Sequence, residues 1–249
     1  MKGEIAMIKN IEGYELNIHT DYPAKSVSYN STPRSLSNIK YIVIHYTGNK
    51  GDKASSNARY YAQSNTRTAG AHFFVDKSGE VYRSIAMKYT AWSVGGDMRS
   101  GDGGGRLYGK CTNANSVSIE LCDCLDNAGY KQSLAVRMLV KYIKSECPNA
   151  KTIVRHWDVN GKHCPAPMIG KNNLKWKHLK NFINGKRVFI AKVTETAYVR
   201  KKPTVNSDSV LTLEKGAKIK VIGEKGKWGK VRVKGIVRYV NLTKITFSK

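Results

Sequence analysis

The segment YIVIHYTG, residues 41–48, places a continuous apolar run, Tyr41 to Ile44, directly before His45 and ends in a glycine. A short run of β-branched and aromatic residues that stops at a glycine predicts a buried strand followed by a turn. Further strands are predicted at 72–76, 80–85, 116–121 and 152–157, and helices at 55–63, 133–147 and 173–183. Strands that alternate with helices predict an α/β domain with a mixed central sheet flanked by helices.

The two ends of the chain have a different character. Residues 1–38 are polar and rich in turn residues, with weak strand signals, so we expect them to wrap the first domain. Beyond Lys186, short alternating runs recur at 198–200, 209–213, 218–222, 228–233 and 236–240, which predicts a small all-β barrel. The expected organisation is a first domain at 1–184, a linker at 185–191 and a barrel at 192–249.

The charge is strongly one-sided. Lys and Arg number 43 against 18 Asp and Glu, a formal net charge of +25. Residues 188–249 alone carry 15 basic and 4 acidic residues. Such an excess attracts polyanions, whether nucleic acid, anionic membrane or anionic wall polymer. No motif of a nucleic-acid-binding fold is present and no apolar run is long enough to span a bilayer, so neither nucleic-acid binding nor insertion into a membrane is expected.

The first residues, MKGEIAMIKNIEGYELN, contain no continuous apolar run after the first lysine. A secretory signal is therefore not expected, and the sequence favours synthesis in the cytoplasm and release through a membrane lesion made by another protein. The chain has five cysteines, an odd number that argues against a disulfide framework and leaves a thiol available to a metal. They are Cys111, Cys122, Cys124, Cys147 and Cys164.

Three of the residues that can bind a metal follow predicted strands. His45 ends the first strand, His156 ends the strand TIVRHW, and Cys164 lies eight residues after His156. Strand ends are rigid, so side chains there are held in place before a ligand arrives. Two imidazoles and a thiolate suit zinc, and three protein ligands leave the fourth tetrahedral position to water, as in catalytic zinc sites.

Spacing alone leaves other assignments open, because a histidine at a strand end is commonly a hydrogen-bonded structural residue. The competing histidines and cysteines are His19, His72, His163, His178, Cys122 and Cys124. Cys122 and Cys124 would lie on one strand face, a poor geometry for chelation, and are better interpreted as small buried residues. Seven glycines between residues 95 and 109 predict a flexible rim; a phosphate-binding role there lacks the required strand and helix.

Four segments, in the order VIHYTG (43–48), GAHFFV (70–75), SVSIELC (116–122) and RHWDVNGKHCPAP (155–167), together resemble the type 2 N-acetylmuramoyl-L-alanine amidase family. The likeness covers roughly residues 20–183, and the last segment is its most specific part. The family includes phage and bacterial cell-wall amidases and the animal peptidoglycan-recognition proteins. The resemblance implies that His45, His156 and Cys164 bind Zn²⁺ and that the substrate is the amide between N-acetylmuramic acid and L-alanine.

The resemblance also implies two catalytic residues. Glu120 would serve as acid or base, and its strand position turns it away from Ile119 and Leu121; the alternative is a solvent-facing glutamate. Lys162 would stabilise the oxyanion; the alternative is one more solvated cation. Asp158 is expected to orient His156 or its loop.

The sequence departs from the family at two positions. Ala71 stands where many members have a tyrosine, which moves the acid–base task toward Glu120. Ser93 stands where many have a histidine, so substrate contacts there are expected to differ.

The run from Ala197 to Val240 resembles bacterial SH3-like wall-binding domains, although Lys202 and Arg238 replace the usual glycines. Tyr198, Trp228 and Tyr239 are expected either to line a groove for peptidoglycan or to fill the barrel core. Together the two parts predict a peptidoglycan hydrolase, either a phage lysis endolysin or a bacterial autolysin, that also binds anionic wall polymers. The alternative is a non-catalytic peptidoglycan-binding protein, which the presence of Cys164 disfavours.

Overall fold

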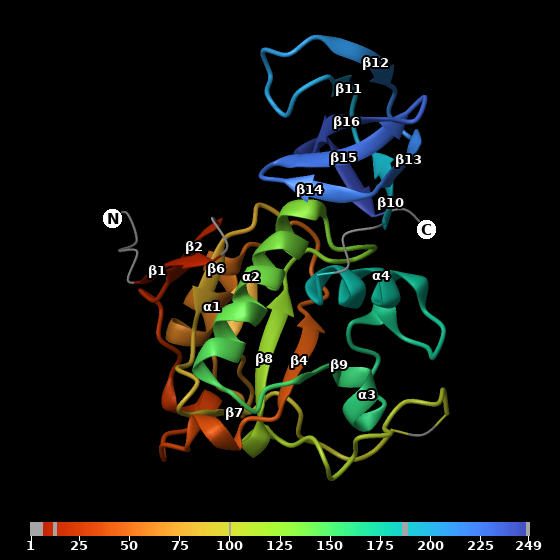
Figure 1. The fold of residues 1–249 in the computed structure, drawn as a ribbon. Coiled ribbons are helices and arrows are strands. Elements are labelled where there is room, and N and C mark those ends of the chain that lie inside the picture. The colour runs from red at the N-terminus through yellow and green to blue at the C-terminus, as the bar shows by residue number, and fades with distance from the viewer. Residues whose placement is uncertain (1–6, 12–13, 100, 186–188, 248–249) are drawn as a thin grey trace.

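The first domain is built on a seven-stranded mixed sheet (Figure 1). The computed structural model describes residues 7–11, 14–99, 101–185 and 189–247. The strand order is β1-β2-β6-β5-β8-β4-β9, with β1 (Met7–Ile11), β2 (Tyr14–His19), β4 (Tyr41–Tyr46), β5 (Phe73–Val75), β6 (Val81–Arg83), β8 (Ser116–Leu121) and β9 (Thr152–Arg155). β4 runs parallel to both β8 and β9, whereas β5 and β6 form the predicted antiparallel hairpin. The predicted mixed α/β sheet is confirmed.

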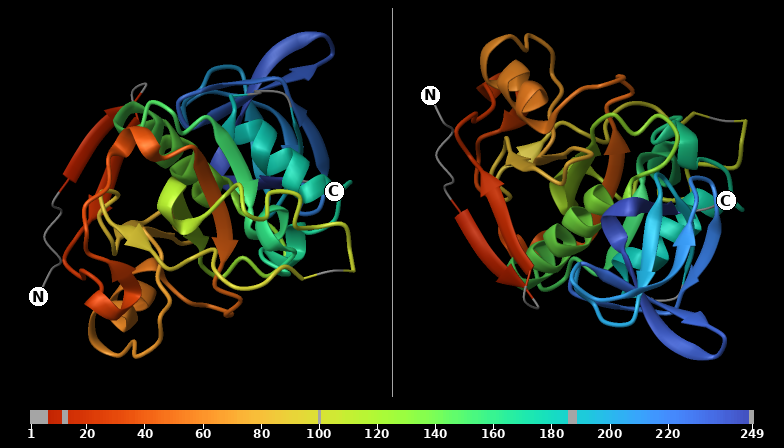
Figure 2. Two further views of the ribbon diagram at one scale, coloured as in Figure 1. Left: turned by 90° about the horizontal axis from the view of Figure 1, so that it is seen from below. Right: turned by 90° about the horizontal axis from the view of Figure 1, so that it is seen from above.

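Helices cover both faces of this sheet (Figures 1 and 2). α2 (Tyr130–Glu146) packs on the face that presents Ile42 and Ile44, and α1 (Ala54–Gln63) packs on the face that presents Phe74. The remaining helices are α3 (His156–Asn160) and α4 (Leu174–Ile183), with short 3₁₀ turns at Ser26–Ser28, Leu36–Asn38, Asn113–Asn115, Ala166–Met168 and Leu242–Lys244. A two-stranded ribbon joins β3 (Tyr29–Asn30) to β7 (Thr90–Ala91).

The second domain is all β, as predicted. One sheet has the order β13-β10-β17 and the other β12-β11-β16-β15-β14. The strands are β10 (Phe189–Val193), β11 (Ala197–Arg200), β12 (Ser209–Leu213), β13 (Lys218–Val221), β14 (Gly223–Lys225), β15 (Trp228–Val233), β16 (Ile236–Asn241) and β17 (Ile245–Phe247). Alternate residues such as Val199, Val231 and Val240 are buried between the sheets.

Two sequence-based boundaries differ from the structure, and the N-terminal segment has a larger role than expected. β10 begins at Phe189, inside the predicted linker, because Phe189, Ala191 and Val193 alternate into the barrel core. The predicted strand 152–157 ends at Arg155, where α3 begins. The N-terminal segment does more than wrap the domain, because β1 and β2 extend the main sheet; residues 1–6 and 186–188 lie outside the described residues.

The two domains share a hydrophobic core. Tyr130 at the start of α2 and Phe182 near the end of α4 belong to the same buried cluster as the barrel residues. The Phe182 and Phe189 rings meet edge to face with centroids 5.8 Å apart. Gly129 forms an isolated β-bridge with Thr246 of β17. The barrel is therefore packed against the first domain, and Figure 1 shows it seated over one end of α2 and over α4.

Within the described residues, no helix combines the length and the apolar character that crossing a membrane requires.

Candidate metal centre

The sheet register brings His45 next to His156. His45 is the fifth residue of β4, and the pairing of β4 with β9 ends at Ile44 and Arg155. The next residue on each side of that pair is a histidine. The two imidazole rings are both buried, with centroids 4.7 Å apart and an interplanar angle of 64°. In Figure 1 the β4 arrow points toward the end of the first domain on which the barrel is seated.

His156 opens α3 because of a local capping arrangement. The carboxylate of Asp158 accepts hydrogen bonds from the Arg155 backbone N–H (2.9 Å) and from the Arg155 Nε (3.0 Å). Burial opposes ionisation of Asp158, but the bonds from Arg155 outweigh it and lower the pKa. Asp158 makes no bond to the His156 ring, so its role is to hold the turn that carries His156 rather than the imidazole itself.

Cys164 returns to the same place after α3. Gly161, at φ 78°, ends the helix in the left-handed conformation that glycine tolerates. The Cys164 Sγ lies 3.7 Å from the His45 Nδ1. A tetrahedral zinc ion with ordinary bond lengths separates a sulfur and a nitrogen ligand by about 3.5 Å. The three candidate ligand atoms all lie within 4.8 Å of one another, and the three side chains are buried.

The donor atoms fit a metal ion because they lack other partners. Both ring nitrogens of His156 and the Nε2 of His45 are buried without a hydrogen-bond partner among the described residues. Buried polar atoms are normally paired, and an unpaired one is destabilising, so this cluster of unpaired donors indicates a ligand.

The electrostatics support the same conclusion. Burial, then His156 and Lys162, hold the pKa of His45 well below its usual value, and burial and Lys162 lower the pKa of His156 to about 3. Both imidazoles are therefore neutral at pH 7, the form that binds a metal. Burial, reinforced by Glu120, raises the pKa of the Cys164 thiol to about 12, so it becomes a thiolate here when a cation coordinates it.

Glu120 lies beside this cluster. It occupies the register position opposite His45 on the neighbouring parallel strand, and Phe74 pairs with it on its other side. Its Oε2 is buried without a hydrogen-bond partner in the described structure. Burial raises the pKa of Glu120 to about 7, against the opposing effect of Lys162 and with a contribution from Asp52. A carboxyl group with this pKa can both accept and release a proton near neutral pH.

Lys162 is exposed at the edge of the cluster. Its backbone N–H donates to the Asn160 Oδ1 at 3.1 Å, which fixes the turn between α3 and Cys164. Its charge lowers the pKa of His45, His156 and Glu120, so the ammonium group is close enough to act on all three. The fold thus gathers the five residues singled out from the sequence: His45, Glu120, His156, Lys162 and Cys164.

The competing residues lie elsewhere. His72 is fully engaged: its Nδ1 accepts the Ser118 backbone N–H and its Nε2 bonds the Tyr89 carbonyl, each at 3.1 Å. His19 stacks on Tyr82, His163 pairs with Asp102, and His178 lies on α4. Cys122 and Cys124 are buried, as expected, but lie in the turn after β8 and in two different clusters rather than on one strand face.

The glycine-rich segment is bound to the ligand-bearing loop, which the sequence did not indicate. Asp102 accepts the Trp157 indole N–H and meets the His163 Nε2, both at 2.7 Å. A Cβ on Gly104 would come within 2.8 Å of Gly161 Cα and of the Trp157 carbonyl oxygen. Glycine is therefore needed at 104 and 161, because the backbone of the glycine-rich segment touches the backbone of the loop after α3 there. These two glycines are the local sequence signal of this contact.

The aromatic residues proposed for a wall-binding groove lie on the outer side of the barrel. Tyr198 is 50 % exposed, and its neighbour Val199 fills the core. Tyr239 pairs with Arg200, and Trp228 lies outside the cluster that forms the barrel core. Of the two alternatives for Trp228, the outer surface is therefore the one observed.

Comparison with known proteins matches both parts of the chain. Residues 35–167 match the family model described as N-acetylmuramoyl-L-alanine amidase, and residues 195–243 match that of the bacterial SH3 domain. Two N-acetylmuramoyl-L-alanine amidases of Bacillus subtilis (strain 168) are similar. BlyA is 32% identical over 61% of this chain and 42% of its own length. CwlA is 28% identical over 70% of this chain and 60% of its own length. The chain thus spans about half the length of these curated relatives. The solved catalytic domain of XlyA is 27% identical, with a TM-score of 0.50, over 67% of this chain and 99% of that domain.

Proposed function

The chain belongs to the N-acetylmuramoyl-L-alanine amidase family, and we propose that it is a zinc-dependent hydrolase of peptidoglycan. The bond cleaved is the amide between N-acetylmuramic acid and the L-alanine of the stem peptide. The observation that carries the proposal is the buried cluster of His45, His156 and Cys164, with Glu120 at the adjacent register position.

His45, His156 and Cys164 would hold the ion, because they supply two neutral imidazoles and a thiol with no competing partners. A zinc ion in such a site polarises a carbonyl group and lowers the pKa of water. The protein contributes the fixed positions of the ligands, which come from the ends of two paired strands and from a capped turn.

Glu120 moves the proton. In the proposed reaction its carboxylate accepts a proton from the attacking water, whose oxygen forms a bond to the lactyl carbonyl carbon. The C–N bond then breaks, and the Glu120 carboxyl returns the proton to the alanine nitrogen. The products are a lactyl carboxylate on the sugar and a stem peptide with a free amino terminus. Lys162 donates to the oxyanion that develops on the carbonyl oxygen.

The barrel would hold the enzyme on its substrate. Tyr198, Trp228 and Tyr239 lie on its outer side, and the barrel carries many lysines and arginines for anionic wall polymers. Tethering to the wall raises the effective concentration of cleavable bonds without requiring tight binding. A role in phage lysis, with release through a membrane lesion, stays a prediction.

The test is digestion of purified cell walls followed by mass spectrometry of the soluble fragments. The proposal expects stem peptides with a new N-terminal alanine, and none from the Cys164→Ala variant. New reducing sugar ends would identify a glycosidase instead. Protein that sediments with walls and releases no fragments would identify a binding protein without catalysis.

A further inference from the structure

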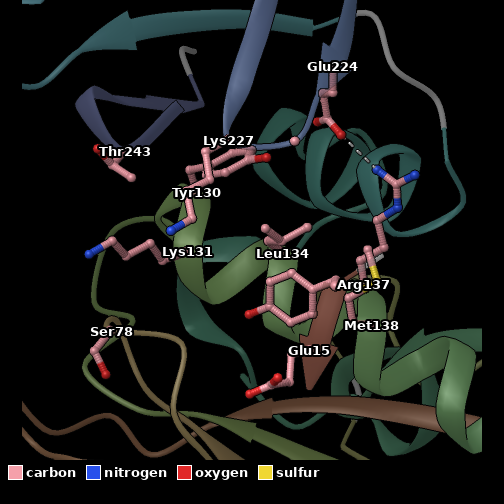
Figure 3. A pocket seen from close by; sticks show the side chains of 12 residues that line it. Glu15, Ser78, Tyr130, Lys131, Leu134, Arg137, Met138, Glu224, Lys227 and Thr243 are labelled. Atoms are coloured by element: carbon pink, nitrogen blue, oxygen red, sulfur yellow. Dashed lines mark hydrogen bonds and ion pairs between the residues drawn. The ribbon is translucent and has the colours of Figure 1, made fainter. Parts of the chain in front are cut away.

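A cleft lies between the first domain and the barrel (Figure 3). Its volume is about 750 Å³, within the range of about 300–1,000 Å³ that small-ligand sites occupy, and such sites favour domain interfaces. The first domain contributes α2, the start of β2 and the turn between β5 and β6, and the barrel contributes the turn after β14 and Thr243. The cleft contains none of the metal-centre residues.

The floor of the cleft is built from α2. Tyr130 and Arg137 line it and are only 6% and 4% exposed. The Tyr130 hydroxyl is buried and has no hydrogen-bond partner among the described residues, and the same holds for the Arg137 Nε. Leu134 and Met138 add apolar surface between these polar groups. A buried phenol and a buried guanidinium with unused donors are the kind of groups that fix a ligand in an otherwise apolar pocket.

The charge of the cleft favours an anion. Arg137 is already paired with Glu224 at 3.3 Å, and this pair joins the two domains. The rim adds Lys131 and Lys227, which Figure 3 shows on the same side of the cleft, against Glu15. The cleft is thus lined by three cationic side chains, Lys131, Arg137 and Lys227, and by two acidic ones, Glu15 and Glu224. α2 also starts at Tyr130 without a side-chain cap and without an acid in its first turn, which leaves the helix dipole uncompensated.

We propose that this interdomain cleft binds an acidic peptide through a carboxylate, with Tyr130 as hydrogen-bond donor and Lys131 and Lys227 as the charged rim. A single carboxylate matches the small net positive charge, whereas Glu15 and Glu224 would repel a multiply charged polyphosphate. The apolar floor suits small aliphatic side chains. The inference rests on the proposed function in one respect: the stem peptide, with its alanines and free carboxyl groups, is the acidic peptide that function brings to the protein. The site is separate from both the metal centre and the outer aromatic surface of the barrel.

The experiment measures binding of a synthetic N-acetylated stem pentapeptide, acetyl-L-Ala–γ-D-Glu–L-Lys–D-Ala–D-Ala, whose carboxylates outnumber its ammonium groups, to the full chain by titration calorimetry. Tyr130→Phe removes only the unpaired hydroxyl and breaks no existing bond, so it keeps the fold. We expect it to weaken the peptide Kd by about fivefold to tenfold. The double variant Lys131→Met, Lys227→Met is expected to weaken binding similarly and to reduce its dependence on salt. Tyr60→Phe and Lys215→Met, exposed residues outside the cleft, serve as matched controls and should bind as the parent does.

The peptide with all carboxyl groups amidated is expected to bind at least tenfold more weakly. Unchanged affinity in both cleft variants, or equal affinity for the amidated peptide, would overturn the proposal and leave only a water-filled space between domains. Preferential binding of a glycerol-phosphate polymer to the same cleft would overturn it as well. Cys164→Ala should bind the peptide normally; the cleft is thereby tested apart from the amidase activity, whose failure would appear only in the wall digest.

Discussion

Glu120 of β8 and His45 of β4 occupy the same register position on neighbouring parallel strands. Side chains at paired positions of adjacent strands lie on the same face of the sheet. Phe74 pairs with Glu120 on its other side, and that face is the one covered by α1, so the pair lies opposite the main core under α2. The sheet itself therefore fixes the carboxyl group beside the cluster of metal ligands, and no flexible loop is needed to bring it there.

Replacing this carboxyl group tests its role. Glu120→Gln keeps the size of the side chain but removes the proton acceptor, so hydrolysis of cell walls should fall by about 10²- to 10⁴-fold. Zinc content should stay at the level of the parent, because Glu120 is not among the proposed ligands. Glu146→Gln, an exposed glutamate at the end of α2, is the control. Activity within threefold of the parent in Glu120→Gln would assign the proton transfer to another group.

Lys162 should shift the pH profile through Glu120. Burial raises the pKa of Glu120 and the Lys162 charge lowers it, so removing the charge raises that pKa further. A general base works in its deprotonated form, so activity rises with pH through the pKa of Glu120. In Lys162→Met the acidic limb of kcat/KM against pH should therefore move to higher pH, with a lower plateau from loss of oxyanion stabilisation. Lys162→Arg should restore the position of the limb; an unmoved limb in Lys162→Met would contradict this coupling.

The barrel should stabilise the first domain. Phe189 is 8% exposed and packs edge to face on Phe182 at the domain junction. Phe189→Ala should lower the free energy of unfolding by about 3 kcal/mol, or roughly 6–12 °C in Tm for a chain of this size. Ile236→Ala, at a side chain 54% exposed, should change Tm by less than about 2 °C. Equal Tm values for the two variants, measured by calorimetry, would mean that the domains are independent.

A buried histidine should make the fold sensitive to acid. Burial and the neighbouring Arg34 lower the pKa of His72 to about 3, whereas an unfolded histidine has a pKa near 6.5. Between these values the unfolded state binds the extra proton, so stability is full above pH 6.5 and falls as the pH drops toward 3. His72→Gln should reduce the slope of unfolding free energy against pH by up to ~1.4 kcal/mol per pH unit. Urea titrations of the parent and His72→Gln from pH 7 to pH 4 give the two slopes. Identical slopes would show that unfolding adds no proton at His72.

Much of the site could be predicted because its residues are short-range features of the sequence. His45 directly follows the apolar run Tyr41–Ile44, and Glu120 alternates with buried neighbours in SVSIEL, so both strands and both faces follow from local pattern. The start of α3 was also encoded locally, since Asp158 stands three residues after Arg155 as a capping pair. The β-branched run before His156 concealed it and extended the predicted strand too far.

The missed features depend on contacts between distant residues. The first residues of β10 fell within the predicted linker, and their place in the barrel core depends on packing across the domain junction, where Phe189 meets Phe182. The ion pair between Arg137 and Glu224 joins residues 87 positions apart, and no local pattern marks it. The attachment of Asp102 to Trp157 is also set by tertiary packing, so a glycine-rich segment expected to be a flexible rim is attached to the loop between His156 and Cys164.

The most direct test of the metal centre is the zinc content of purified protein, measured by plasma mass spectrometry beside its activity on cell walls. The parent and His163→Ala, whose exposed imidazole faces Asp102, should each contain about one zinc per chain. Cys164→Ala should retain little zinc after dialysis and release no peptides with an N-terminal alanine. A Cys164→Ala protein that keeps a full equivalent of zinc and cleaves walls at the parent's rate would contradict the assignment of His45, His156 and Cys164.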